Sequence, residues 1–478
     1  MKKITCIFLA VLLPNLLPLS ASALELTCTP GALSGLTAAV ETETELILKG
    51  EVDASDLLGL STKMPSLRRL DLSACTVSGA IPEGAFAGSQ LAEVVFPLAG
   101  SVIVGDFAFA GTRLKNVEIP ASVSKLGVAA FAGCHELESV ILKGTSTSGY
   151  AFANCPALKK ATLTGVSAVN DCDFVDCPAL EIVEGSDAVV KIGASAFRGA
   201  VSLASFDFGE NLCSIGAKAF AGSGIKNVSL DASASLQTIG DMAFTDCKQL
   251  TSFSAPDKAL IGRGALMGCS ALEHAAMGSR NGIADYLATG NSTLLSINLP
   301  SEASVMGRYA LKGASSVSSL SLPEGLTAIG DHAMDGMTSL QSISADNVAA
   351  VPALGEAVFD GIDRGAVRLA VSEALYNEFK TTPVWQEFDI VDKTNVLHPG
   401  VSERQSIKAR FIGNILEVVS ATEDIAGLEL FDVSGRCVMT IKGNGRMAQA
   451  DVSSTDIDIY IVRCTTASSV VATLKIAR

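Results

Sequence analysis

The feature that most constrains the fold is a repeat of about 23 residues that runs through most of the chain. Each copy, here called a coil, contains one bulky apolar residue, the anchor, which is usually a phenylalanine preceded by alanine. A coil this short cannot bury its apolar face alone, so the coils must stack on one another. The sequence therefore predicts a solenoid with one continuous apolar column inside it. We place its thirteen anchors at Phe86, Phe109, Phe131, Phe152, Phe174, Phe197, Phe220, Phe244, Leu266, Leu287, Leu311, Met334 and Phe359.

A strand pattern, L-x-x-L-x-L, lies upstream of the anchors. Its clearest copy runs from Leu67 to Leu72. The alternation predicts a short strand with apolar side chains on one face, while the x positions point outward. Stacking would then give a parallel sheet on one face of the solenoid. We expect short strands or helical turns on the other face.

Glycine stands four residues before the anchor in nine coils. Either a turn with positive φ or a close approach of two backbones would require it. The nine are Gly105, Gly127, Gly193, Gly216, Gly240, Gly262, Gly307, Gly330 and Gly355.

The combined motif, I-G-x-x-A-F-x-G-C with L-x-x-L-x-L, is most complete at 239–247 and 126–134. It resembles the BspA-like leucine-rich-repeat family over about residues 60 to 392. Asn170 and Ile283 depart from it at the glycine position. The resemblance implies a leucine-rich-repeat solenoid exposed at a bacterial surface. Some members of the family are adhesins for host matrix proteins or for other bacteria.

Six regions follow from these patterns. Polar residues interrupt the repeats before an alternating tail, which predicts a small C-terminal all-β sandwich. We assign a signal peptide at 1–23, an N-terminal cap at 24–66, leucine-rich repeats at 67–363, a C-terminal cap at 364–392, a linker at 393–406 and the β-sandwich at 407–478.

The first residues predict export. Lys2 and Lys3 precede a mostly apolar stretch, and Ala21-Ser22-Ala23 has the small residues of a cleavage site. No later segment reaches the ~18 consecutive apolar residues of a spanning helix. We expect an exported protein at the cell surface or outside the cell, associated with the outer membrane.

The tail has a hairpin pattern at 428–438 and a strand at 459–463. Together with its basic end, it resembles the C-terminal sorting domain of the type IX secretion route. That resemblance implies recognition by the secretion machinery. Asp458 stands where that family usually has glycine. The alternative is a plain β-sandwich that shields or presents the solenoid.

The cysteines follow the repeat. Five of the twelve stand three residues after an anchor, at Cys134, Cys155, Cys177, Cys247 and Cys269. Small residues occupy this position in other coils, so we expect buried free thiols there. Cys437 with Cys464 would be the best disulfide, and Cys28 with Cys75 a weaker one.

Little in the composition points to chemistry. A net charge of −15 argues against nucleic acid as a partner. No catalytic motif or cofactor site is recognisable, and the four histidines lack the spacing of metal ligands. We therefore expect no enzyme. The acidic group of Asn170, Asp171, Asp173 and Asp176 has hard oxygens that suit Ca²⁺, but a solvated turn is favoured.

The outward row of the strands is the remaining candidate surface. Its first eight middle positions include four acids, which we take as candidate ligand-binding residues: Asp71, Glu118, Glu184 and Asp207. We predict a secreted scaffold that binds a basic protein partner, such as a host matrix or bacterial surface protein, through many weak contacts. The alternatives are a structural spacer of the cell envelope and, third, an enzyme or glycan-processing accessory.

Overall fold

The computed structural model describes residues 2–5, 23–36, 40–256, 258–277 and 282–392, and in the tail 407–412, 414–420, 424–432, 437–443, 445–453, 459–467 and 471–477. The chain consists of two compact units, Met1–Thr394 and Asn395–Arg478. Most of the predicted signal peptide and the whole predicted linker lie outside the described residues.

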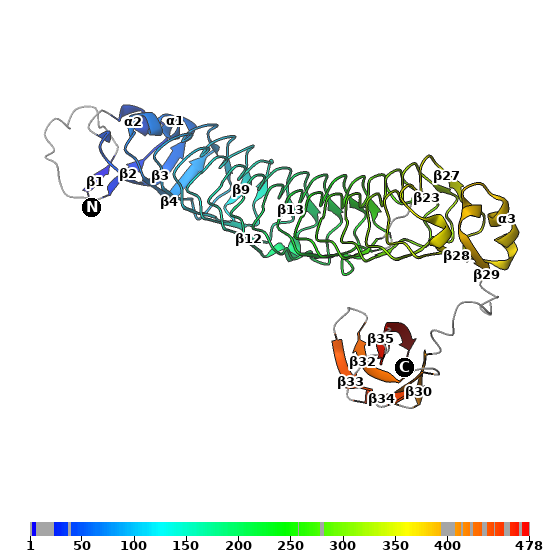
Figure 1. The fold of residues 1–478 in the computed structure, drawn as a ribbon. Coiled ribbons are helices and arrows are strands. Elements are labelled where there is room, and N and C mark those ends of the chain that lie inside the picture. The colour runs from blue at the N-terminus through cyan, green and yellow to red at the C-terminus, as the bar shows by residue number, and fades with distance from the viewer. Residues whose placement is uncertain are drawn as a thin grey trace. The chain divides into compact units, whose positions relative to one another are not determined.

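The first unit is the predicted solenoid (Figure 1). Its coils carry parallel strands on a face that we call the strand face. Four sheets follow one another there: β1 (Lys2–Thr5), β2 (Leu24–Cys28), β3 (Glu45–Asp53), β4 (Arg69–Ser78) and β6 (Glu93–Val95); β8 (Asn116–Ile119), β10 (Ser139–Lys143), β12 (Lys160–Thr164) and β14 (Ile182–Glu184); β17 (Asn227–Ser229), β19 (Ser252–Ser254), β21 (His274–Ala276) and β22 (Ser296–Asn298); β24 (Ser319–Ser321), β26 (Ser342–Ala345), β28 (Arg368–Val371) and β29 (Asp389–Asp392).

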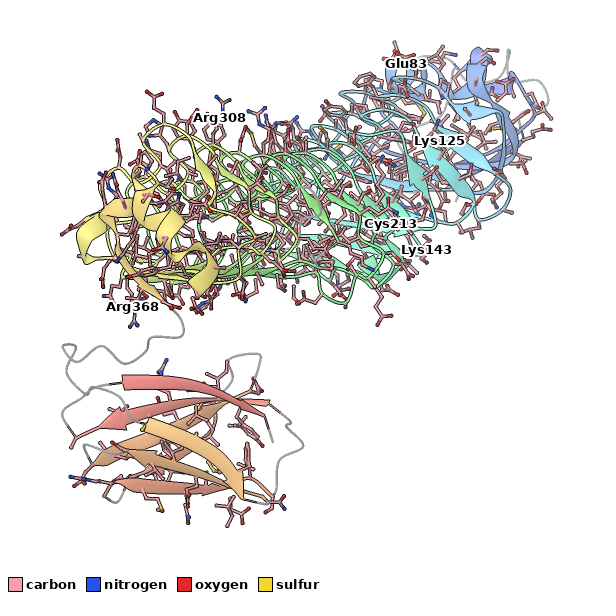
Figure 2. The ribbon with its side chains drawn as sticks, turned by 90° about the vertical axis from the view of Figure 1, so that its right-hand side faces the viewer. Glu83, Lys125, Lys143, Cys213, Arg308 and Arg368 are labelled. Atoms are coloured by element: carbon pink, nitrogen blue, oxygen red, sulfur yellow. The ribbon has the colours of Figure 1, made fainter. Side chains whose placement is uncertain are left out.

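Shorter parallel strands form the opposite face, as expected. Figure 2 shows Lys143 and Arg368 along one long side of the solenoid, and Glu83 and Arg308 along the other. The short strands are β5 (Ala80–Ile81), β7 (Val102–Val104), β9 (Val123–Leu126) and β11 (Ser146–Thr147); β13 (Ala168–Val169), β15 (Lys191–Ile192), β16 (Ser214–Ile215), β18 (Thr238–Ile239) and β20 (Leu260–Ile261); β23 (Val305–Met306), β25 (Ala328–Ile329) and β27 (Ala353–Leu354).

The anchors line up inside the solenoid and confirm the predicted column. Eight phenylalanine rings, from Phe86 to Phe244, stack face to face with centroids 5.1 to 5.5 Å apart. All eight are buried, and so are Leu266, Leu311, Met334 and Phe359 beyond them. Stacked aromatic pairs contribute beyond their buried area, so the first part of the column is its most regular.

The tenth anchor was placed one residue too early. In the other coils the anchor N–H donates to the residue before the next anchor, as Phe244 does to Ala265. Leu266 donates to Leu287, and Ala288 donates to Ala310. Ala288 therefore holds the anchor position and Leu287 the alanine position. The two residues have exchanged places, so the larger one misled the alignment.

The same shift corrects the glycine position of that coil. Ile283 pairs with Met306, the strand residue before Gly307, so Ala284 and not Ile283 replaces glycine. The two errors share one cause.

The glycine four residues before the anchor recurs because two backbones approach closely there. A Cβ on Gly240 would lie 2.4 Å from the backbone nitrogen of Ala217 in the preceding coil. Positive φ occurs instead two residues before the anchor, for example 57° at both Lys218 and Met242. Of the two reasons predicted for glycine, steric contact is therefore the one that applies.

An aspartate next to that glycine ties successive coils together. Asp241 Oδ1 accepts the backbone N–H of Arg263 in the next coil at 2.9 Å. A Cβ on Gly262 would lie 2.6 Å from the same oxygen. Asp106 and Asp331, which also follow a glycine, make the equivalent bond, and so do Asp171 and Asp285, which follow Asn170 and Ala284. The Gly-Asp pair is thus one device for spacing and joining coils.

Residues assigned to the N-terminal cap extend the strand face through β2 and β3. Their helical turns are η1 (Ala32–Gly35), α1 (Ala54–Leu57) and α2 (Leu60–Lys63). Buried Asp56 accepts the backbone N–H groups of Gly31 and Leu33, at 3.0 and 2.8 Å. A buried carboxylate with such donors fixes the loop that covers the first coils.

The last residues of the first unit close the other end. They form β28, β29, η4 (Arg364–Ala366), η5 (Glu373–Leu375), α3 (Tyr376–Thr381) and η6 (Trp385–Glu387); a further turn, η3 (Ser186–Ala188), lies within the repeats. Trp385 is buried against Phe359 and Phe379, with ring centroids 5.3 Å away in both cases. Its indole N–H donates to the carbonyl oxygen of Pro352 at 3.0 Å.

The second unit is an antiparallel β structure, which agrees with the predicted all-β tail. One sheet has the order β30-β31-β34 and the other β33-β32-β35-β36. Leu416, Val418, Leu430, Tyr460 and Val462 are among its buried residues. The strands are β30 (Ile407–Ile412), β31 (Ile415–Ser420), β32 (Ile425–Phe431), β33 (Cys437–Lys442), β34 (Met447–Asp451), β35 (Ile459–Thr466) and β36 (Val471–Ala477).

Candidate binding face

Within each sheet of the strand face, the middle outward positions lie side by side, whereas Asp207 belongs to none of the described strands. Glu118, Ile141, Thr162 and Glu184 are successive register partners. Neighbouring strands in a sheet lie about 4.8 Å apart, so such a row offers one side chain per coil at a fixed spacing.

Three of the four candidate acids are already neutralised by neighbouring cations. Glu118 lies 2.6 Å from Nζ of Lys143, and Glu184 lies 2.8 Å from Nζ of Lys160. Both pairs are exposed, so each contributes at most about 1 kcal/mol. The N-terminal part of the strand face therefore alternates in charge and is not simply acidic.

Asp71 is the most enclosed of the four, with 14% of its side chain exposed. Its carboxylate lies 2.9 Å from Arg69, which also pairs with Glu93 at 3.0 Å. Burial pushes the pKa of Asp71 upward, but hydrogen bonds from Ser73 and Arg69 outweigh it and the pKa is lowered. Asp71 thus supports its own strand as well as facing outward.

Asp207 differs from the other three acids. It is exposed, and within the described part of the chain no ion pair involves its carboxylate. Of the predicted site residues, it is therefore the one whose charge is freely available to a partner.

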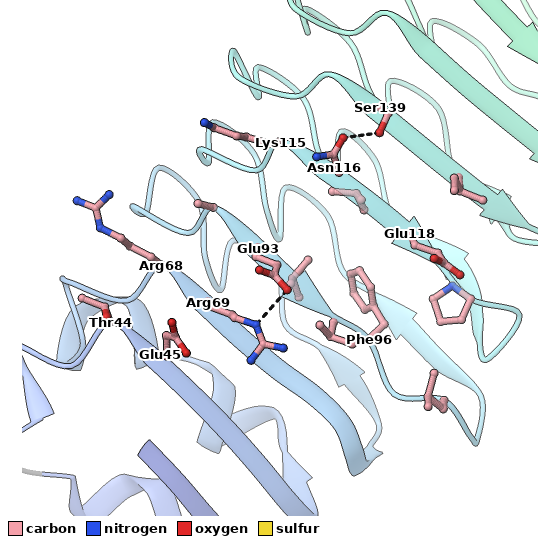
Figure 3. Close-up of a pocket in the computed structure, with 17 residues that line it drawn as sticks. Thr44, Glu45, Arg68, Arg69, Glu93, Phe96, Lys115, Asn116, Glu118 and Ser139 are labelled. Carbon is pink, nitrogen blue, oxygen red and sulfur yellow. Dashed lines mark hydrogen bonds and ion pairs between the residues drawn. The ribbon is translucent and has the colours of Figure 1, made fainter. Parts of the chain in front are cut away.

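A recess of about 790 Å³ opens in the strand face between β6 and β8 (Figure 3). The ladder that joins β4 to β6 is not continued to β8, which pairs with β10 instead. A hydrogen bond of 3.4 Å from the Lys115 N–H to the Ala92 carbonyl spans the break. β6 has three residues and ends at Val95, two residues before Pro97.

The recess has a polar and an apolar side. Arg68 and Lys115 extend from the edge at the start of the strands (Figure 3). Val95, Leu98 and Ile141 contribute apolar surface, and Leu98 is 72% exposed. Sequence reasoning missed this site because Leu98 belongs to the part of its coil that does not repeat.

Farther along, the strand face changes to small polar residues. In five successive strands the middle residue is buried and the two residues beside it face outward. These outward positions carry mostly serine and asparagine. The members are Asn227, Ser229, Ser252, Ser254, Ser296, Asn298, Ser319 and Ser321, with His274 and Ala276 between them.

The acidic group in the middle of the repeats is not the solvated turn that the sequence favoured. Asp173 is buried and accepts hydrogen bonds from Thr147 Oγ1 at 2.6 Å and from the backbone N–H groups of Asn170 and Ala151. Asp171 bonds the next coil, and Asp176 pairs with Arg198 at 2.9 Å. The three carboxylates therefore make three separate contacts. Asp173 is buried because it takes the position of the alanine that precedes the anchor in other coils.

Five cysteines form a buried row of free thiols. Each donates from Sγ to the anchor carbonyl of the preceding coil, at 3.1 to 3.3 Å. Burial raises the pKa of Cys247 to about 11, so that thiol stays protonated and remains a donor at neutral pH. Asn291 takes the same position in its coil and donates to Leu266.

Neither of the two disulfides considered from the sequence is formed among the described cysteines. Cys28 and Cys75 are both register partners of Gly50, on opposite sides of it. They are two strand spacings apart, about 9.6 Å, which exceeds the reach of a disulfide.

Two further searches cover the described residues alone. Among them, no group of three or more His, Cys, Asp or Glu side chains is placed to hold a metal ion. None of the helices found there has the length and apolar character needed to cross a membrane.

Comparison with solved structures finds leucine-rich-repeat proteins. A leucine-rich-repeat protein from Bacteroides ovatus has 22% sequence identity and a TM-score of 0.52, with 77% of this chain and 83% of that chain covered. One from Eubacterium ventriosum has 16% identity and a TM-score of 0.38, covering 71% and 89%. A leucine-rich cell surface protein from Faecalibacterium prausnitzii has 21% identity and a TM-score of 0.35, covering 59% and 86%. The first of these shows the fold.

Comparison by sequence identifies the family. No curated protein matches the chain. The family model for the BspA type leucine rich repeat region matches in six copies, over residues 70–181, 167–288 and 281–364. These segments make up more than half of the 478 residues. The chain therefore belongs to the BspA-type leucine-rich-repeat family.

Proposed function

We propose that this protein is exported and displayed at the bacterial surface, where its strand face binds a protein partner. The observation that supports the proposal is the register of the outward rows, which gives one side chain per strand at constant spacing within each sheet of the strand face. Such a face suits many weak contacts that add up through avidity.

The chemistry of the face supports an adhesive role. Charges alternate in its N-terminal part, and small polar side chains cover the part beyond. Exposed polar groups of this kind contact protein surfaces directly or through water. Binding of this kind requires an extended surface and not a deep pocket.

The four acids remain the proposed contacts to a basic partner. Three of them form ion pairs within the protein, so basic groups of the partner must displace Arg69, Lys143 and Lys160 from these carboxylates. Asp207 needs no exchange and is expected to contribute most.

The test is capture of host matrix and bacterial surface proteins by the purified chain. The variant Asp71→Asn, Glu118→Gln, Glu184→Gln, Asp207→Asn should bind a captured basic protein roughly tenfold or more weakly at low salt. A matched control carries Glu83→Gln, Glu210→Gln, Glu302→Gln and Glu324→Gln, which are exposed acids outside the row. Equal affinity of both variants would reject the acidic contacts, and no captured protein at all would favour a spacer.

Export and sorting are tested on cells. We propose that the leader is removed near Ala23 and that the C-terminal β unit directs the chain to the surface. Cell fractionation with sequencing of both mature termini checks this. A chain that lacks residues 407–478 yet reaches the surface normally would reject the sorting role and leave a shielding role for the unit.

A further inference from the structure

We propose that the recess between β6 and β8 binds an acidic, partly aliphatic segment of a partner protein. This rests on the proposed function, because it specifies the chemistry of a segment that the strand face would hold. Carboxylates of the segment meet Arg68 and Lys115, and an aliphatic side chain packs against Leu98 and Ile141.

The charge around the recess leaves two cations available. Arg69 is occupied by Asp71 and Glu93, and Lys143 is occupied by Glu118. Arg68 and Lys115 are both exposed, and the ion pairs found between described residues include neither of them.

The spacing of these cations fits an extended peptide. The Ala92 N–H donates to the Arg68 carbonyl at 2.7 Å, and the Lys115 N–H donates to the Ala92 carbonyl. The two cations are therefore two strand steps apart, about 10 Å, with a small residue between them. In an extended chain, residues three apart are separated by about 10 Å. Acids at positions i and i+3 of the segment match the site.

The other side of the recess offers apolar surface that water now covers. Leu98 is the most exposed large apolar residue of the described chain, at 72%. Val95 and Ile141 are half-buried beside it, over buried Phe96. An exposed apolar patch with a polar rim is typical of a protein-binding site.

The same lining disfavours a polyanion or a sugar. Glu45, Glu93 and Glu118 also line the recess, so a densely sulfated chain would meet repulsion as well as attraction. The aromatic residue in the lining, Phe96, is buried and offers no face for stacking on a sugar ring. One or two carboxylates on a protein segment suit the site better.

The probe is a fluorescein-labelled peptide of sequence Gly-Asp-Ser-Ser-Glu-Gly-Gly-Leu-Val-Gly, titrated with the full chain and followed by fluorescence anisotropy. Its aliphatic residues follow the second acid, because Leu98 and Ile141 lie farther along the strands than the two cations. The double variant Arg68→Ser, Lys115→Ser should raise its Kd about tenfold. Leu98→Ser should raise it several-fold. The matched controls are Lys226→Ser with Lys248→Ser, and Leu295→Ser, which replace exposed residues elsewhere and should leave Kd within about twofold.

The inference would be overturned if the peptide showed no saturable binding, or if the cation variant and its control bound it equally. It would also be overturned if a heparin oligosaccharide bound in place of the peptide and this binding depended on Arg68 and Lys115. The assay is independent of the capture experiment. Peptide binding without any captured surface protein would remove the proposed function and keep the recess. Capture of a surface protein without saturable peptide binding would keep the proposed function and remove the recess.

Discussion

At the scale of single residues, the backbone of the neighbouring coil decides which side chains fit. Gly240 faces the backbone of Ala217 and Gly216 so closely that a methyl group has no room. Asp241 beside it must be a short acceptor, because it reaches the N–H of Arg263 in the next coil. The Gly-Asp pair is thus explained by contacts that run along the solenoid.

Gly240→Ala should lower the free energy of unfolding by about 1–3 kcal/mol, because the added Cβ forces two coils apart. Urea denaturation followed by circular dichroism measures the loss. Gly35→Ala is the control, since a Cβ there would meet no atom within 4 Å. A similar loss in both variants would contradict the steric explanation.

At the scale of elements, two neighbouring coils share a buried polar network that replaces the usual apolar pair. Asn170 Nδ2 donates to Thr147 Oγ1 at 2.9 Å, and Thr147 donates to Asp173. Burial raises the pKa of Asp173 above 3.8, although hydrogen bonds from Thr147, Ala151 and Asn170 favour its charged form.

The raised pKa gives a defined pH dependence. Since the protonated carboxyl is favoured in the folded state, its stabilising contribution is present below pH 3.8 and is lost as the pH rises through the folded-state pKa. The unfolding free energy of the wild type minus that of Asp173→Asn should therefore fall as pH increases from acid toward neutral. Urea titrations over this range measure it, with exposed Glu210→Gln as the control. A difference that grows with pH would reject the expectation.

Most strands and their register could be predicted from the sequence, but the copy of the strand pattern at 203–208 forms no strand. The ion pairs between strands could not be predicted. The alternating pattern marks which residues face outward, and stacking aligns equivalent positions. Glu118 and Lys143, however, are 25 positions apart and occupy different places in their coils. The recess was likewise hidden, because it depends on a break between β6 and β8. Pro97 follows β6 at the same distance as Pro256 follows β19, whose ladder continues to β21, so the proline does not mark the break.

At the scale of the whole first unit, the end of the column must be covered. Trp385 packs there against Phe359 and Phe379, and its indole N–H donates to the carbonyl oxygen of Pro352. An uncovered end would expose apolar residues and unpaired strand edges to other chains.

Trp385→Ala should cost about 3–5 kcal/mol and promote aggregation. Trp385→Phe retains a ring and loses the hydrogen bond, so it should cost closer to about 1 kcal/mol. Chemical denaturation and light scattering of both variants provide the measurements. Equal losses would show that the hydrogen bond, and not packing over the last coil, dominates.

The sequence by itself determined the solenoid, its apolar column and the outward rows, because each depends on a local period that stacking multiplies. Sequence reasoning misplaced the tenth anchor, because Leu287 and Ala288 are exchanged relative to the other coils. The exchange keeps the summed side-chain volume of the pair and shows only in the hydrogen-bond register. Tertiary structure alone decided which charges are paired, why glycine is required and where the strand face opens. These depend on distances between atoms in different coils, which no single repeat contains.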